Sequence, residues 1–187
     1  MNKLIVRKLN DESVIKIIIE ENKTELYDII YQRYIQKVTD KCYSLLKNKQ
    51  LADEFANDIL IKTFEKLKSF KGNSSFSSWL YSITYNYTID FLRKKKHLHY
   101  PNWNIENELP EIIDESYSEI SELSYENLLY IFDKIHAEEK ALLLMKYQDG
   151  LSIKVIAESM LISEDAVKMR LKRARARVVY LYQREFD

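Results

Sequence analysis

A dense run of positive side chains lies near the C-terminal end of this 187-residue sequence. Six of ten consecutive positions are lysine or arginine: Lys168, Arg170, Lys172, Arg173, Arg175 and Arg177. Cations at this density can neutralise the phosphates of a nucleic-acid duplex, while side chains early on the same helix can reach base edges in the major groove. The alternative interpretation is a solvated basic face on an ordinary terminal helix.

The apolar residues around this run predict two consecutive helices. One stripe recurs at steps of four, three, four and three through the basic run: Val167, Leu171, Ala174, Val178 and Leu181. A shorter face precedes it at Ile153, Ile156, Ala157 and Met160. Ser152 and Ser163 are the expected N-caps of the first and second helix. A short helix, a tight turn and a longer basic helix predict a helix-turn-helix that binds DNA.

Stepping about 100° per residue around the second helix identifies its outward face. That face is expected to hold Asp165, Met169, Lys172 and Ala176, with Lys168 and Arg173 beside them. We expect the earlier residues of this face to enter the groove and the later cations to contact phosphate.

The net charge of zero conceals an uneven distribution. No lysine or arginine occurs from His97 to Asp133, whereas this segment is rich in carboxylates: Glu106, Glu108, Glu111, Asp114, Glu115, Glu119, Glu122 and Glu126. The cations therefore gather in two patches, at Arg93–Lys96 and from Lys168 onward, as expected of a chain that contacts nucleic acid at two places.

Composition predicts an all-α fold of two small helical domains joined by a linker, the C-terminal one a helix-turn-helix. Only 2 glycines and 2 prolines are present, which favours long helices. Cys42 is the single cysteine, so no intramolecular disulfide can form and a cytosolic compartment is expected. No signal peptide or membrane span is expected, because charged residues interrupt the apolar pattern near the N-terminus.

Several helix boundaries are predicted in the N-terminal half. Asp11 or Ser13 is the expected cap of a first helix, and Thr24 that of a long second helix. The second helix forms an antiparallel hairpin with a third that follows residues 48–50. The loop at Phe70–Ser75 ends in a serine cap and precedes a helix from Phe76 to about Lys96.

The second half begins with a linker that holds both prolines, and its helices follow. Helices are expected over 126–134 and 137–147, and Gly150 is the expected C-terminal cap of the latter.

Catalytic and metal-binding patterns are weak in this sequence. His97, His99 and His136 lie near no cysteine and lack the helical pairing with glutamate that a zinc site needs. The two glycines, Gly72 and Gly150, cannot form a phosphate-binding loop. We therefore expect no active site, metal or cofactor.

Two motifs together resemble bacterial sigma factors, and the compact two-domain build resembles their extracytoplasmic-function (ECF) group. Phe76-x-x-Trp79-Leu80-x-x-Ile83-x-x-Asn86-x-x-x-Asp90-x-x-Arg93-Lys94 is similar to conserved region 2, and Asp53–Asp58 with Phe64 is similar to the helix that binds core polymerase. The segment from Tyr147 to Arg175 resembles region 4. A helix-turn-helix alone is common, whereas both motifs in this order are highly specific.

The resemblance implies a transcription initiation factor without enzymatic activity, which binds core RNA polymerase and directs it to promoters. It implies four segments: an N-terminal extension (1–23), region 2 (24–96), an acidic linker (97–125) and region 4 (126–187). Core polymerase would contact Asp53, Glu54, Asn57 and Asp58. The flipped base and backbone of the minus-ten element would contact Phe70, Asn73, Ser74, Asn86, Arg93, Lys94 and Lys95, with Asn86 facing the loop. The minus-thirty-five element would contact Ser163, Asp165, Lys168, Met169, Lys172 and Arg173.

Two positions depart from the family pattern. Leu161 occupies the turn position where glycine is usual, so it must bear any positive φ at a cost of order 1 kcal/mol. Val155 stands where a glutamate commonly completes the capping box with Ser152.

The sequence leaves alternatives open. The chain could be a stand-alone helix-turn-helix regulator with an N-terminal dimerisation domain and a palindromic site. It could also sequester polymerase or a regulator through its N-terminal hairpin. If it is a sigma factor, an anti-sigma factor is a further candidate partner. The acidic linker then either runs toward the RNA exit path, as family linkers do, or screens the basic helices.

Overall fold

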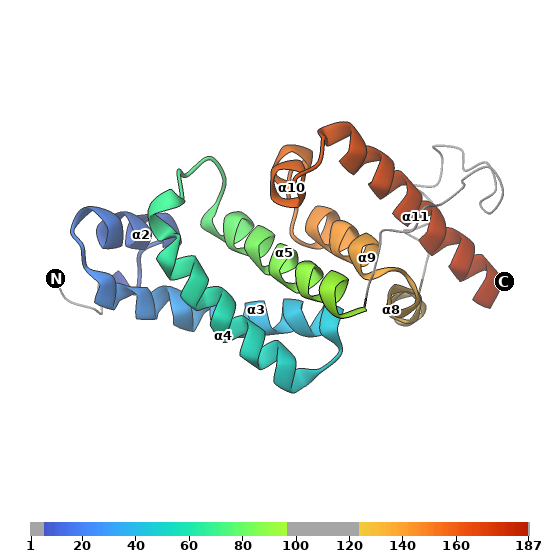
Figure 1. The fold of residues 1–187 in the computed structure, drawn as a ribbon, viewed down its shortest axis with the longest axis horizontal. Coiled ribbons are helices and arrows are strands. Elements are labelled where there is room, and N and C mark those ends of the chain that lie inside the picture. Colours follow the sequence, from blue (N-terminus) through green and yellow to red (C-terminus); the bar gives the residue numbers. More distant parts are fainter. Residues whose placement is uncertain (1–5, 97–123, 187) are drawn as a thin grey trace. The chain divides into compact units, whose positions relative to one another are not determined.

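The computed structural model describes residues 6–96 and 124–186, and every regular element in these ranges is helical, which confirms the all-α prediction. The chain divides into two compact units, Met1–Leu92 and Arg93–Asp187 (Figure 1). The first part contains α2 (Asp11–Glu20), the 3₁₀ turn η1 (Thr24–Leu26), α3 (Tyr27–Leu46), α4 (Lys49–Glu65), the 3₁₀ turn η2 (Leu67–Ser69) and α5 (Phe76–Lys96). The second contains α8 (Tyr125–Lys134), α9 (Ala137–Leu143), the π-helical turn η4 (Leu144–Gln148), α10 (Ile153–Met160) and α11 (Glu164–Phe186).

The expected antiparallel hairpin of α3 and α4 forms the centre of the first unit (Figure 1). Lys47 ends α3 in the left-handed conformation (φ 53°), and the Asn48 side chain accepts from Leu51 N at 2.9 Å to cap α4. Cys42 lies buried on the core face of α3, and burial raises the pKa of its thiol to about 11. It therefore serves as a small apolar residue of the core.

The N-terminal helix α2 packs into the same core. Its apolar face buries Val14, Ile15 and Ile18. Arg33 of α3 fixes the segment before α2, because its guanidinium donates to Asp11 Oδ1 at 2.5 Å and to the Leu9 carbonyl at 2.8 Å. The described residues that precede α3, from Val6 onward, are thus an integral layer of the first unit.

Three predicted caps in this region are wrong. Asn10, rather than Asp11 or Ser13, caps α2 by accepting from Ser13 N at 2.9 Å, because the Asp11 carboxylate accepts from Arg33 and Tyr34. Thr24 caps nothing: it begins η1, whose first bond runs from Leu26 N to Lys23 O at 3.1 Å, and α3 starts after this turn.

In the second unit, His136 and Glu139 form a capping box at the start of α9. His136 Nδ1 accepts from Glu138 N, and Glu139 Oε2 accepts from His136 N, each at 3.3 Å. The helix expected to continue to residue 147 instead changes to π geometry at Leu144, because Asp149 N bonds back five residues to Leu144 O. Gly150 then adopts a positive φ of 65° and ends the segment, as predicted.

No helix within the described ranges is both long and apolar enough to cross a membrane. The same residues contain no group of three His, Cys, Asp or Glu side chains arranged to hold a metal ion.

Candidate nucleic-acid interface

The predicted helix-turn-helix is present as α10 and α11. Ser152 caps α10 by accepting from Val155 N at 3.2 Å, and Ser163 caps α11 by accepting from Ala166 N at 3.1 Å. Leu161 connects them in the left-handed conformation (φ 55°), as its position in the turn predicts. The bond from Ile162 N to Ala157 O, at 3.1 Å, closes the turn.

The first half of α11 presents a polar outer face. Val167 and Leu171 are buried, whereas the residues on the other side are exposed: Ser163, Asp165, Lys168, Met169 and Lys172. Lys168 Nζ donates to Asp165 Oδ1 at 3.0 Å, and this hydrogen bond raises the pKa of Lys168. The lysine charge is therefore retained on a face that is free to meet a duplex.

The later cations of α11 are organised differently from the prediction that they contact phosphate. Arg170 and Arg177 turn toward α9, where their guanidinium nitrogens lie 3.6 Å from Glu138 and 3.7 Å from Glu139. Both glutamate side chains are almost fully buried, and the arginine side chains are only 23% and 13% exposed. Buried carboxylates require cationic partners, so these two arginines are part of the domain interior.

Three further residues of α11 are also partly or fully buried or bound within the second unit. Arg173 is half-buried, with its Nε enclosed, and Arg175 Nη1 donates to the Tyr147 hydroxyl at 2.9 Å. Ala176 is buried, so its expected outward position is wrong. The exposed residues of the outer face therefore lie between Ser163 and Lys172.

Burial shifts the pKa values of both side chains of the α9 capping box. Desolvation raises the pKa of Glu139, although Arg177 opposes that shift. Desolvation also lowers the pKa of His136, and the neighbouring Arg177 acts in the same direction. A neutral His136 can accept from Glu138 N, which is the hydrogen bond the cap requires.

The loop before α5 is anchored at both ends. The half-buried ring of Phe70 packs against Phe76 at 5.7 Å and Trp79 at 5.3 Å between centroids. At the other end, Ser75 Oγ accepts from Ser78 N at 3.2 Å, and Glu12 of α2 accepts from Phe76 N at 3.1 Å. Between these anchors lie Lys71, Gly72 and Asn73, all exposed, and Ser74, which is half-exposed.

The other predicted minus-ten residues lie further along α5. Asn86 follows Phe76 by ten residues, which corresponds to about 15 Å along the axis, so it does not face the end of the loop at Ser75. Asn86 and Arg93 are half-buried, whereas Lys94 and Lys95 are exposed. These side chains extend from the loop toward the C-terminal end of α5 and do not form one cluster.

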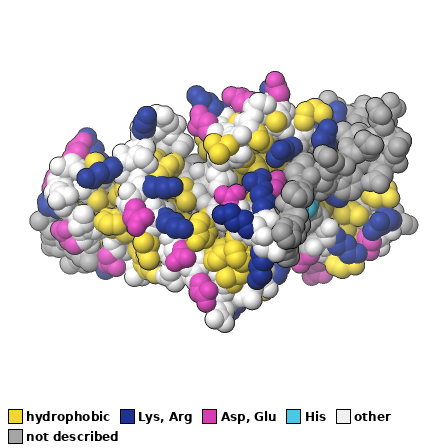
Figure 2. All heavy atoms as spheres, viewed as in Figure 1, with side chains coloured by type: hydrophobic (Ala, Val, Ile, Leu, Met, Phe, Trp, Pro, Cys, Tyr) yellow, Lys and Arg dark blue, Asp and Glu magenta, His cyan; other side chains and the backbone are white. Residues whose placement is uncertain are grey.

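The predicted polymerase-binding residues share the exposed face of α4: Asp53, Glu54, Asn57 and Asp58. Hydroxyl groups from both neighbouring helices hold this face, since Tyr31 donates to Asn57 Oδ1 at 2.5 Å and Tyr87 donates to Asp58 Oδ2 at 3.3 Å. Figure 2 shows acidic side chains recurring along α4 with hydrophobic ones between them.

Two exposed apolar residues extend this face: Phe64, which the sequence analysis placed in the motif of this helix, and Ile61, which it missed as a site residue. Ile61 is 57% exposed and Phe64 is 36% exposed. Ile61 follows Asn57 by one helical turn, so an apolar residue in register with the polar face was the available signal. An exposed apolar centre beside carboxylates is typical of a protein-binding surface.

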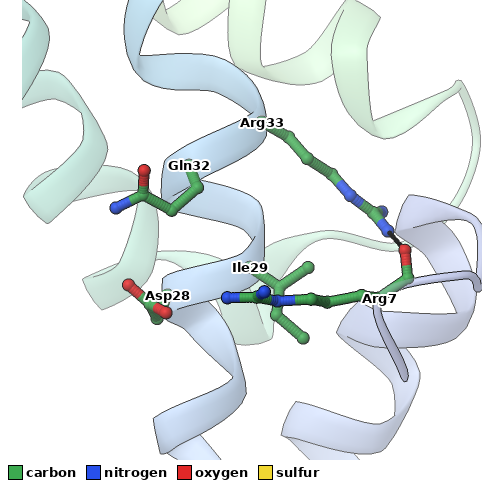
Figure 3. Close-up of a pocket in the computed structure, with 5 residues that line it drawn as sticks. All are labelled: Arg7, Asp28, Ile29, Gln32 and Arg33. Carbon is green, nitrogen blue, oxygen red and sulfur yellow. Dashed lines mark hydrogen bonds between the residues drawn. The ribbon is translucent and has the colours of Figure 1, made fainter. Parts of the chain in front are cut away.

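A separate pocket of about 450 Å³ lies beside α3, lined by Arg7, Asp28, Ile29, Gln32 and Arg33 (Figure 3). Arg33 donates to the Arg7 carbonyl at 2.9 Å there. Its guanidinium is already bound to Asp11 and two carbonyls, which makes it a structural group.

Comparison with known proteins gives consistent matches across both units. Residues 30–98 match the family model for sigma-70 region 2, and residues 125–178 match that for sigma-70 region 4. The chain is 29% identical over 171 residues to the ECF RNA polymerase sigma factor SigW of Bacillus subtilis, covering 84% of this chain and 89% of that protein. It is 26% identical over 181 residues to the ECF RNA polymerase sigma-E factor of Haemophilus influenzae, covering 91% and 94%.

Two solved structures share the fold. CnrH, solved in complex with the cytosolic domain of CnrY, matches with a TM-score of 0.60 at 15% identity, covering 97% of each chain. The sigma factor RpoE of Bartonella quintana, solved with the anti-sigma factor NepR, matches with a TM-score of 0.56 at 19% identity, covering 82% of this chain and 94% of that one.

Proposed function

The chain belongs to the ECF group of bacterial sigma factors, which direct RNA polymerase to promoters, and on this basis we propose how its surfaces divide that work. The proposed segments are an N-terminal extension (1–23), a region-2 domain (24–96), an acidic linker (97–125) and a region-4 domain (126–187).

The first half of α11 is the proposed reader of the minus-thirty-five element. Its exposed Asp165, Lys168, Met169 and Lys172 follow a capped N-terminus, and helix-turn-helix proteins insert this part of the helix into the major groove. Ser163, at the start of the helix, is proposed to lie beside a phosphate of the same element. Arg173, half-buried, contributes its charge at the edge of this surface.

The loop before α5 is the proposed capture site for a melted minus-ten base. Phe70 supplies an aromatic wall, and Asn73 and Ser74 supply short polar groups for a base edge. Because Asn86 lies about 15 Å along α5 from Phe76, we propose that it contacts a different nucleotide of the same strand. Arg93, Lys94 and Lys95 would then attract the backbone.

The outer face of α4 is the proposed contact with core polymerase. Asp53, Glu54, Asn57 and Asp58 supply negative and polar groups for a basic partner surface, and Ile61 supplies an apolar centre.

Sigma factors are initiation factors and not enzymes, and we propose that this chain likewise has no catalytic activity of its own. Its work on polymerase implies a cytoplasmic location. An anti-sigma factor is a proposed regulator, because the RpoE relative was solved with one. The alternative of a stand-alone regulator with an N-terminal dimerisation domain is not favoured, since both sigma regions are matched in order.

The observation that supports this proposal best is the presence of both sigma regions on one chain, with a capped, outwardly polar α11. Run-off transcription tests it with bacterial core polymerase on genomic promoter-length fragments. We expect discrete starts that appear only when the protein is added. A specific footprint from the protein alone, with no polymerase-dependent start, would instead favour the stand-alone regulator.

A further inference from the structure

Met169 is an apolar side chain on an otherwise polar surface. It is 47% exposed on α11, and its outward neighbours Asp165, Lys168 and Lys172 are all charged. Val167 and Leu171 face the domain core from the opposite side of the helix. Met169 therefore does not complete the core of the second unit, and its side chain is available to a partner outside the domain.

The charged neighbours are arranged so that they leave Met169 uncovered. Lys168 Nζ is drawn toward the helix N-terminus by its hydrogen bond to Asp165 Oδ1 at 3.0 Å. These two side chains remain 60% and 88% exposed, so they satisfy one another without turning inward. Met169 is the next outward residue along the helix. It lies in the first half of α11, the part that would enter a major groove.

The chemistry of the major groove limits what an apolar side chain can recognise there. Every base pair presents donors and acceptors, but thymine alone adds an apolar group, its 5-methyl. A methionine side chain is flexible and polarisable, so it can pack on a methyl group without a fixed hydrogen-bond geometry. We infer that Met169 packs against the methyl group of a thymine in the minus-thirty-five element and selects thymine at that position. This inference rests on the proposed role of α11.

The test uses the full-length protein with core polymerase on a promoter whose start has been mapped by run-off transcription. Each thymine of the minus-thirty-five element is replaced singly by deoxyuridine, which keeps the hydrogen-bonding groups and lacks only the methyl. Binding of thymine and deoxyuridine promoters is compared by competition. The variants are Met169→Ala, which removes the contact, Met169→Leu, which retains an apolar side chain, and Lys172→Ala, which removes a neighbouring charge.

We expect one position at which the wild-type protein prefers thymine by about fourfold, equivalent to about 0.8 kcal/mol for one buried methyl group. Met169→Ala should abolish the preference and Met169→Leu should keep most of it. Lys172→Ala should weaken binding of both promoters equally. An element without thymine, the absence of any methyl effect, or an unchanged effect in Met169→Ala would each overturn the inference. If no protein-dependent start can be mapped, the proposed function fails first, and the inference falls with it.

Discussion

Arg177 Nε lies 3.7 Å from Glu139 Oε2, and the two side chains are 13% and 1% exposed. This ion pair joins α11 to the start of α9, together with the pair formed by Arg170 and Glu138. Such a pair does not by itself show net stabilisation, but removal of one partner leaves a buried charge uncompensated.

We therefore predict that Arg177→Ala lowers the free energy of unfolding of the second unit by about 3 kcal/mol. The double variant Glu139→Gln, Arg177→Met should recover most of the loss, because it removes both charges at similar volume. Urea denaturation measures both effects. Lys172→Ala, on the exposed face, is the matched control and should leave stability unchanged. An Arg177→Ala protein of native stability that binds promoter DNA weakly would show that Arg177 contacts phosphate.

The neutral state of His136 predicts a dependence of stability on pH. Burial lowers the pKa of His136 in the folded chain below its ordinary value of 6.5. As the pH falls through about 6.5, the unfolded chain takes up a proton that the folded chain does not, so stability is lost as the pH falls. The raised pKa of Glu139 acts with the opposite sign, but in a window that begins near 4.5.

Thermal unfolding between about pH 6 and 8 follows the histidine contribution. His136→Asn keeps a side-chain acceptor for the cap and removes the titration, so it should flatten the profile. Lys154→Gln, at an exposed position of α10, is the control and should retain the wild-type slope. A wild-type profile that does not fall below about pH 6.5 would contradict this assignment.

The periodicity of Val167, Leu171, Ala174 and Val178 was sufficient to predict which side of α11 faces the core. It could not predict the direction of Arg170 and Arg177, which lie about 60–80° from the centre of that stripe and can turn either way. Their direction is decided by Glu138 and Glu139, about thirty residues earlier in the chain. Local patterns specify a helix face, whereas a buried ion pair is a tertiary property.

The same contrast between local and tertiary interactions explains which helix caps were predicted correctly and which were not. Ser152 and Ser163 each accept from a donor three residues away, so a serine before an apolar run was a sufficient signal for the caps of α10 and α11. Asp11 looked like a cap, but its carboxylate is held by Arg33, more than twenty residues later. For this reason the sequence alone could not predict how the N-terminal extension (residues 1–23) packs.

Leu161 predicts a stabilising substitution. Its positive φ of 55° disfavours a side chain with a Cβ, and the leucine is 90% exposed, so its burial contributes little. Leu161→Gly should raise the stability of the second unit by up to about 1 kcal/mol. Thermal unfolding measures it, with Lys47→Gly as a comparison at a similar φ of 53°. A loss of stability in Leu161→Gly would show that the leucine makes contacts of greater value than the strain.

A substitution of Ile61, the exposed apolar residue of the α4 surface, should affect polymerase binding without affecting folding. Ile61 is 57% exposed, so Ile61→Ser should not destabilise the first unit, yet it should weaken binding to core polymerase by about tenfold. Tyr43, 47% exposed on α3, provides the control, and Tyr43→Ser should bind normally. Equal affinity of the two variants, measured by fluorescence anisotropy, would exclude Ile61 from the interface.

Glu12 predicts a role for the N-terminal helix in promoter melting. Its carboxylate accepts from Phe76 N at 3.1 Å, which fixes the end of the loop proposed to hold a melted base. Glu12→Ala removes a contact equivalent to a helix cap, about 1 kcal/mol, and should loosen the loop without abolishing polymerase binding. Open-complex formation, followed by permanganate reactivity of minus-ten thymines, should fall several-fold.

A promoter with a pre-melted minus-ten segment separates this effect from general damage. Because the loop then meets bases that are already unpaired, the defect of Glu12→Ala should be smaller on this template than on the duplex. Lys16→Ala, at an exposed position of the same helix, should behave as wild type on both templates. If Glu12→Ala melted duplex promoters normally, α2 would support the core of the first unit without positioning the loop. An equal defect on both templates would place its effect on DNA or polymerase binding instead of melting.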